Sequence, residues 1–186
     1  MPFMETPIAG LIVFEPKVWK DDRGYFYESY NTQTFAAAGI DAVFVQDNQS
    51  LSTKGVLRGL HYQVAPFAQA KLVRVLEGEV LDVAVDIREE SPTYGQHYSI
   101  RLSAENKKQL FIPRGFAHGF VVLSETAVFS YKCDNFYAKE QEGGIRYNDP
   151  QLNIDWLLPA DQLILSPKDE QHPLLGAHRP VEIPIS

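Results

Sequence analysis

Apolar and polar residues alternate with a period of two through much of residues 43–133, and this pattern predicts β-strands. In segment 80–87, apolar residues at odd positions alternate with Val80, Asp82, Ala84 and Asp86. One face of this strand is therefore expected to be buried and the other to be more polar. Segment 97–102 alternates in the same way, and further strands are predicted at 43–49, 56–63, 71–77, 109–112, 120–123 and 127–133. Turn-forming sequences at 77–79 and 91–95 separate these strands.

Helical patterns are scarce. A short helix is predicted at 33–38, with Asn31 or Thr32 as its N-cap and Gly39 at its end. From Asp134 onward the chain is rich in Gly, Pro and Asn, which predicts loops with short helical turns. Many short strands indicate an antiparallel sandwich or barrel. We expect a single domain over 1–186, with the loop-rich part at about 134–186 packing on the barrel mouth or on a partner subunit.

Composition narrows the class of protein. A chain of 186 residues with 45% hydrophobic residues can bury a core without a metal or disulfide. Its one cysteine, Cys133, cannot form an internal disulfide, which fits a reducing compartment. We find no leader sequence and no apolar run long enough to span a bilayer, so we expect a soluble, cytoplasmic protein without a membrane partner. A net charge of -7 disfavours nucleic acid as a partner, although a small anionic ligand remains compatible with it.

Two strands carry ionisable groups suited to proton transfer. Alternation places His61 and Gln63 on one face of their strand, and Tyr131 shares a face with Phe129 and Cys133. If both faces line the barrel interior, an imidazole and a phenol meet in an apolar pocket, where they could act as base and acid. Buried side chains that are each satisfied by one hydrogen bond would give the same pattern.

Other polar residues also allow two interpretations. Lys71 opens its strand, where it could stabilise an oxyanion or simply be solvated. Gln46 and Asn48 share a face, where they could bind a polar ligand or the neighbouring backbone. Arg23 could grip a phosphate or form a surface salt bridge.

Taken together, the motifs closely resemble those of the dTDP-4-dehydrorhamnose 3,5-epimerases, a family of cupin-fold enzymes. The resemblance runs from about Arg23 to about Leu175. It rests on Asp-Arg-Gly-Tyr-Phe-Tyr-Glu at 22–28, Gln-Asp-Asn at 46–48, Gly-Val-Leu-Arg-Gly-Leu-His-Tyr-Gln at 55–63, Lys-Leu-Val-Arg-Val at 71–75, Pro-Arg-Gly-Phe-Ala-His-Gly-Phe at 113–120, Tyr-Lys-Cys-Asp at 131–134 and Ser-Pro-Lys-Asp at 166–169. The family implies an all-β, cupin-type jelly-roll barrel with a few short peripheral helices, and a homodimer that exchanges its N-terminal strands.

The resemblance also implies roles for individual residues. It makes His61 the catalytic base, Asp169 the carboxylate paired with it, Tyr131 the acid and Lys71 the cation near the sugar's carbonyl oxygen. It assigns substrate binding to Arg23, Phe26, Glu28, Gln46, Asp47, Asn48, Arg58, His118, Tyr137, Glu142 and Lys168. Among these, Arg23 and Arg58 are expected at the diphosphate, and Tyr137 is expected to stack on the thymine.

The implied substrate is a dTDP-linked 4-keto-6-deoxyhexose. Its C3 and C5 hydrogens flank the ketone, so that base, acid and oxyanion stabiliser could invert both centres without a cofactor. A mono-epimerase acting at C3 or C5 only would share His61 and Tyr131, and a 3,4-ketoisomerase on a related nucleotide sugar is a further alternative. A non-catalytic sugar- or nucleotide-binding cupin would leave the set around His61 without a purpose.

Two structural predictions follow from the motif at 55–63. Metal-binding cupins place His-x-His, then Glu, then a later His. Here Gln63 holds the second position, no Glu follows before Lys71, and His118 is the one companion of His61, so we expect no metal. Arg58 and His61 lie three residues apart, so a bulge or sharp twist near Gly59 is needed if both contact one ligand.

Overall fold

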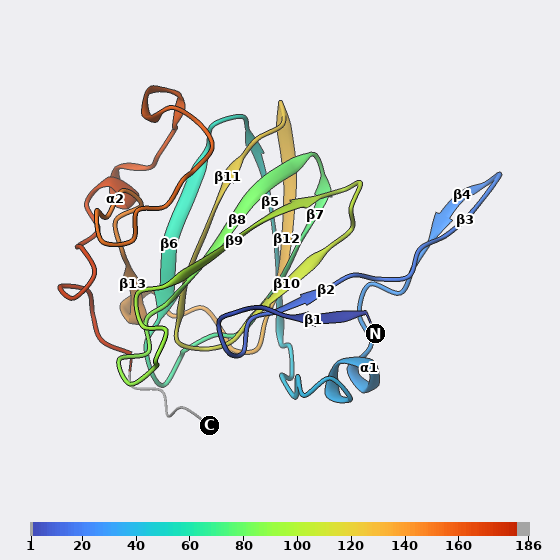
Figure 1. Cartoon of the computed structure of the whole chain (residues 1–186), viewed down its shortest axis with the longest axis horizontal. Helices are drawn as coiled ribbons and strands as arrows, with labels where there is room; N and C mark the ends of the chain where they lie inside the picture. Colours follow the sequence, from blue (N-terminus) through green and yellow to red (C-terminus); the bar gives the residue numbers. More distant parts are fainter. Residues whose placement is uncertain (1, 182–186) are drawn as a thin grey trace.

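The fold is built from two facing antiparallel sheets, seen in a computed structural model that describes residues 2–181 (Figure 1). In spatial order, the six-stranded sheet contains β1 (Phe3–Glu5), β2 (Ile12–Phe14), β10 (Gln109–Ile112), β7 (Lys71–Glu77), β12 (Thr126–Cys133) and β5 (Gln46–Thr53). The five-stranded sheet contains β13 (Glu142–Gly144), β6 (Leu57–Gln63), β11 (Phe116–Val122), β8 (Glu79–Asp86) and β9 (His97–Ser103). This arrangement confirms the predicted all-β jelly-roll barrel.

The helices are short and peripheral, as expected. They are α1 (Thr32–Ala36), α2 (Pro167–Glu170) and the 3-10 turns η1 (Lys139–Gln141) and η2 (Ala160–Gln162). Asn31 caps α1 as predicted, because its side chain accepts hydrogen bonds from the next turn. The helix begins and ends earlier than the predicted 33–38. In the described part of the chain, no helix is long and apolar enough to cross a membrane.

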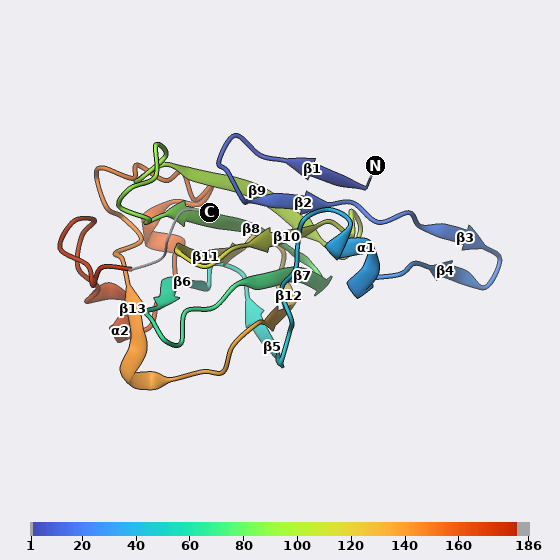
Figure 2. The ribbon, with the colours of Figure 1, turned by 90° about the horizontal axis from the view of Figure 1, so that it is seen from below.

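A third, two-stranded sheet leaves the body of the molecule. It consists of β3 (Trp19–Asp21) and β4 (Gly24–Phe26), and both views show this hairpin extending away from the barrel (Figures 1 and 2). Trp19, Tyr25 and Phe26 on the hairpin are exposed. We call residues 19–26 the arm.

The two barrel sheets enclose one apolar core, and a second core lies outside the five-stranded sheet. Inside, Val80 and Ala84 of β8 pack with residues of the facing sheet. Outside, alternate β8 residues pack against Leu152 and Trp156 of the C-terminal segment. The expectation that only one face of β8 would be buried is therefore wrong, because the C-terminal segment covers the outer face, while the inner face is the more polar one and carries Asp82 and Asp86.

Several strand limits also differ from the prediction. The strand expected at 43–49 is β5, which begins at Gln46 and continues to Thr53, while Val43 and Val45 are exposed outside the ladder. Hydrogen-bonded pairing with β12, rather than the positions of apolar residues, determines where β5 begins and ends. The strand expected at 120–123 begins at Phe116, and the loop-rich C-terminal part contributes β13 to a sheet edge.

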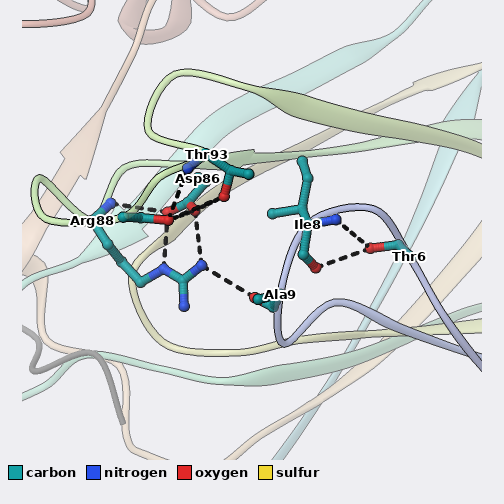
Figure 3. A network of polar contacts seen from close by, with 7 residues as sticks. Thr6, Ile8, Ala9, Asp86, Arg88 and Thr93 are labelled. Atoms are coloured by element: carbon teal, nitrogen blue, oxygen red, sulfur yellow. Dashed lines mark hydrogen bonds and ion pairs between the residues drawn. The ribbon is translucent and has the colours of Figure 1, made fainter.

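A buried carboxylate fastens the turn between β1 and β2 to the barrel. Asp86 accepts hydrogen bonds from Arg88, Ser91 and Thr93, and the guanidinium of Arg88 also donates to the carbonyl oxygen of Ala9 (Figure 3). These bonds compensate the burial of the Asp86 charge, and they hold the pKa of its carboxyl below the usual value even though burial alone would raise it.

Candidate active site

A cavity of about 620 Å³ lies between the two sheets. Residues of β5, β6, β7, β11 and β12 line it, and α2 closes one side. All four predicted catalytic residues line this cavity, together with four of the predicted substrate-binding residues: His61, Lys71, Tyr131, Asp169, Asn48, Arg58, His118 and Lys168. Residues far apart in the sequence thus converge on a single pocket large enough for a small ligand.

His61 and Asp169 form a hydrogen-bonded pair at the cavity wall. His61 Nε2 lies 2.5 Å from Asp169 Oδ1. The Ser166 side chain accepts a hydrogen bond from the Asp169 backbone N–H and so caps the start of α2. This start places the Asp169 carboxylate against His61 of β6. An ionised carboxylate can only accept hydrogen bonds, so Nε2 carries the proton and Nδ1 is the basic atom of the imidazole.

The environment sets the protonation states of this pair. Burial lowers the pKa of His61 below its usual value and outweighs the opposing effect of the Asp169 carboxylate. Burial alone would raise the pKa of Asp169, but the neighbouring imidazoles of His172 and His61 hold it well below the usual range. At neutral pH the pair is therefore a neutral imidazole beside a carboxylate, which is the form needed for a general base.

A bulge places Arg58 and His61 on the same cavity wall. In the pairing of β6 with β11, Arg58 lies opposite Phe120 and His61 opposite His118, so β6 has one more residue than its partner between these positions. Gly59, inside the bulge, has φ +133°, a conformation that favours glycine. The predicted bulge is confirmed.

Tyr131 and Lys71 occupy the facing sheet. Lys71 Nζ lies 5.8 Å from the centroid of the Tyr131 ring. Burial raises the pKa of Tyr131, which keeps its phenol protonated, and burial lowers the pKa of Lys71. Phe120 and Phe129 stack at 4.1 Å between ring centroids and supply apolar surface to the same cavity.

Asn48 and Arg58 in the cavity, and Gln46 beside Asn48 on β5, also have protein partners. Gln46 Nε2 donates to Asn48 Oδ1, and Gln46 Oε1 accepts from the backbone N–H of Tyr137. Arg58 donates to Ser52 Oγ through two nitrogens, each at 3.2 Å. Arg58 therefore presents a guanidinium held in place at the cavity wall, which suits an anionic group.

Tyr137, Glu142 and Lys168 form a cluster beside the cavity. The Tyr137 hydroxyl donates to Glu142 Oε2 at 3.1 Å, and Lys168 Nζ lies 2.5 Å from Glu142 Oε1. Lys168 also lines the main cavity, so the cluster is continuous with it. This pairing with Lys168 holds the pKa of Glu142 below its usual value although burial alone would raise it.

Four predicted substrate-binding residues lie elsewhere in the chain. Arg23 and Phe26 are on the arm, with the Arg23 side chain 90% exposed and paired with Asp21. Glu28 bonds Asn31 at the start of α1. Asp47 is on the opposite face of β5 from Asn48, where it pairs with Lys132 at 3.0 Å. Within one chain, these four do not join the cavity.

Two residues next to the site were not among the predicted ones. Asp82 is fully buried and its Oδ2 lies 2.9 Å from His118 Nε2. Its signal in the sequence was a carboxylate on the more polar face of an alternating strand, the face that the fold turns toward the barrel interior. His172 lies 3.4 Å from Asp169 Oδ1 through its Nε2, and its signal was the spacing of three residues, one helical turn, from Asp169.

The side chain of Gln63, which stands where metal-binding cupins place a histidine, forms hydrogen bonds with backbone groups. Its side-chain amide donates to the carbonyl oxygens of Phe67 and Phe136, and its Oε1 accepts from the N–H of Ala138. These bonds hold the loop before η1 against β6. The side chain therefore serves the fold at this position.

Comparison with known proteins shows the family. The model of the dTDP-4-dehydrorhamnose 3,5-epimerase family matches residues 5–177. The chain is 57% identical over 170 residues to dTDP-4-dehydrorhamnose 3,5-epimerase of Shigella flexneri, covering 91% of this chain and 93% of the relative. It is 59% identical over 165 residues to the enzyme of that name from Pseudomonas aeruginosa, covering 88% and 90%.

A solved structure gives the same result. The crystal structure of dTDP-6-deoxy-D-glucose-3,5-epimerase from Legionella pneumophila, in complex with dTDP-4-keto-L-rhamnose, superimposes with a TM-score of 0.90 at 55% identity. The match covers 94% of this chain and 93% of that one. The chain belongs to the dTDP-4-dehydrorhamnose 3,5-epimerase family.

Proposed function

We propose that the chain is an isomerase that inverts C3 and C5 of dTDP-4-dehydro-6-deoxy-D-glucose to give dTDP-4-dehydro-L-rhamnose, in the biosynthesis of dTDP-L-rhamnose. The observation that carries this proposal is an imidazole and a phenol on opposite walls of one cavity. His61 belongs to the five-stranded sheet and Tyr131 to the six-stranded sheet, and both line the cavity.

Opposite walls give inversion rather than simple exchange. A sugar bound between the sheets presents one face of its ring to His61 and the other to Tyr131. His61 Nδ1 removes the proton on the carbon next to the ketone, and the Tyr131 hydroxyl then donates a proton to the other face of that carbon. The hydrogen ends on the opposite side of the ring, and the configuration is inverted.

Lys71 stabilises the intermediate of each inversion. Removing a proton next to the ketone moves charge onto the ketone oxygen, which becomes an enolate. Lys71 lies on the wall of Tyr131, in surroundings that exclude most water, where a cation interacts strongly with such an oxyanion. Asp169 in turn stabilises the imidazolium of His61 that forms at the same moment.

The arm supports a homodimer. An isolated two-stranded hairpin is at best marginally stable in water, and Trp19, Tyr25 and Phe26 expose apolar surface on it. In a dimer that exchanges arms, the partner's Arg23 and the partner's Phe26 reach the nucleotide end of the cavity, near Arg58 and Tyr137. The dTDP diphosphate then lies between two guanidinium groups.

The single cysteine, Cys133, fits a location in the cytoplasm.

Replacement of the base tests the proposed chemistry. His61→Asn should lower kcat by about 10²–10⁴-fold, because general-base catalysis contributes that much, while the affinity for dTDP stays close to that of the wild type. Turnover is followed by coupling to a reductase specific for the L-configured product, and dTDP binding by calorimetry. Turnover unchanged by His61→Asn would contradict the assigned role. Loss of dTDP binding would show that the variant had disturbed the cavity instead.

A further inference from the structure

A second imidazole, that of His172, lies beside the Asp169 carboxylate. His172 follows α2, and its ring packs over the backbone of Gly144, where a Cβ atom would meet it at 2.3 Å. The rings of His61 and His172 are 5.5 Å apart between centroids and nearly perpendicular. One ligand atom from each of His61, Asp169 and His172 lies within 4.8 Å of the other two.

His172 has a polar atom without a protein partner. Its side chain is about nine-tenths buried, and its Nε2 makes no full hydrogen bond with any described residue, because its one polar neighbour, the Asp169 Oδ1 whose pKa it helps to lower, lies 3.4 Å away. A buried nitrogen without a partner costs free energy, and such groups call for an explanation. Here the unpartnered nitrogen lies beside a carboxylate oxygen that already contacts a second imidazole.

We propose that His61, Asp169 and His172 form a binding site for a divalent transition ion of the zinc class, and that the bound ion inhibits the enzyme. Two imidazoles and a carboxylate are a donor set typical of Zn²⁺, with a fourth position left for water or a ligand. Mg²⁺ and Ca²⁺ prefer oxygen ligands and are not expected to bind here.

The distances suit a small tetrahedral ion after a slight adjustment. Ligand atoms about 2.0–2.1 Å from Zn²⁺ lie roughly 3.3 Å apart. The contact between His172 Nε2 and Asp169 Oδ1 is already 3.4 Å, while the 2.5 Å contact to His61 Nε2 has to open. The ion takes the place of the proton on His61 Nε2, and that proton moves to Nδ1, so the ligating imidazole stays neutral.

Inhibition follows from the residue that the ion occupies. His61 lines the substrate cavity, and with the ion on Nε2 its proton occupies Nδ1, the atom that removes the substrate's proton. An ion on His61 and Asp169 reorients the imidazole and adds charge beside Lys71. The positive charge of Lys71 in the same cavity opposes the ion, so we expect reversible inhibition rather than permanent loading.

The central test uses His172→Gln, which keeps both His61 and Asp169. The variant lacks one imidazole ligand, and we expect its inhibition by ZnCl₂ to need at least about tenfold more metal than the wild type requires, each measured against its own uninhibited rate. EDTA should restore activity in both, and MgCl₂ should not inhibit. Calorimetry without substrate should show one Zn²⁺ per chain in the wild type and weaker binding in the variant.

His178→Gln is the matched control. His178 is likewise buried with an unpartnered Nε2, but its ring contacts Tyr62 and Tyr94 rather than the catalytic pair. Its zinc inhibition should equal that of the wild type. The proposal is overturned if zinc inhibits the wild type and His172→Gln equally, or if both variants lose sensitivity to zinc to the same extent. It is also overturned if the wild type binds no Zn²⁺ up to about 1 mM.

A measurement on the wild type covers the case in which His172→Gln does not fold. Imidazole resonances of the ¹⁵N-labelled protein report each histidine directly. Zn²⁺ should shift the signals of His61 and His172 together and leave those of His97 and His178 in place. Shifts at other histidines alone, or none, would count against the site. Because calorimetry and these spectra need no turnover, they test the metal site separately from the proposed epimerase activity.

Discussion

At the scale of single residues, burial moves the acid and the base toward the states that they need. It lowers the pKa of His61, so that the imidazole is neutral, and raises the pKa of Tyr131, so that the phenol keeps its proton. The same burial is not enough to protonate Asp169, because two imidazoles hold its pKa low. One cavity thus holds the proposed base, acid and counter-ion in the states that they need at the same pH.

Asp169→Asn should change the pH dependence as well as the rate. The carboxylate opposes the effect of burial on His61, so its removal lowers the pKa of His61 further. The acid limb of kcat/KM, which reports protonation of the base, should move to lower pH. The maximum should fall by about 10²–10⁴-fold, because the amide does not stabilise the imidazolium. Rates measured across pH 4–9 would contradict this account if the acid limb moved to higher pH.

The residues predicted from the sequence to act directly were the easiest to identify. His61, Lys71, Tyr131 and Asp169 lie in motifs whose order along the chain is specific, and all four line one cavity. Asp82 and His172 were missed because their importance depends on contacts across the fold. The role of a buried carboxylate or histidine cannot be predicted from the sequence until the residue that it contacts is known.

At the scale of the element, the bulge in β6 positions the site. Regular alternation would place Arg58 and His61 on opposite faces, and the extra residue at Gly59 brings both into the cavity. A Cβ atom at Gly59 would meet Gly119 Cα at 2.5 Å and His118 O at 2.8 Å, both of them backbone atoms. The motif at 55–63 therefore needs glycine for both space and conformation.

Gly59→Ala should destabilise the fold by about 3–5 kcal/mol and abolish turnover, since β6 and β11 must separate to accept it. Gly39→Ala is the control: Gly39 also has a positive φ, +79°, but a Cβ atom there meets nothing within 4 Å. We expect a cost of about 1 kcal/mol and normal turnover for that variant. Urea denaturation measures both, and an equal effect of the two substitutions would refute the close-packed bulge.

The limits of elements were harder to predict than their existence. The strand at 71–77 was predicted with the limits that β7 has, because apolar periodicity and pairing coincide there. β5 is polar over much of its length and pairs with β12 while facing the cavity, so apolar periodicity misplaced it. The C-terminal segment covers the outer face of β8, so both faces of the strand are buried, which no local pattern could reveal.

At the scale of the whole molecule, the arm separates residues that the family's motifs assign to one site. The arm, which carries Arg23 and Phe26, projects from the barrel (Figure 1). Arg58 lines the main cavity, and Tyr137 lines the pocket beside it. In the proposed dimer, each cavity combines a base from one chain with an arm from the other. The sequence could predict both sets of residues but not that one chain keeps them apart.

Mixing two inactive variants tests this arrangement. In heterodimers of Arg23→Ala with His61→Asn, one cavity carries both defects and the other carries neither. Random pairing of equal amounts should therefore restore about a quarter of the wild-type sites. His61→Asn mixed with Tyr131→Phe is the control, because both defects lie in the barrel of the same chain and no intact site can form. Activity no greater than the sum of the separate variants would contradict arm exchange.

The most direct test of the central claim follows hydrogen exchange at the two carbons that are inverted. The protein is incubated with dTDP-4-keto-6-deoxyglucose in deuterated buffer, and NMR follows the label at C3 and C5. The account predicts deuterium at both carbons and an L-configured product that a downstream reductase traps. Label at one carbon alone would mean a mono-epimerase, and no label at either carbon despite dTDP binding would contradict proton transfer by His61 and Tyr131.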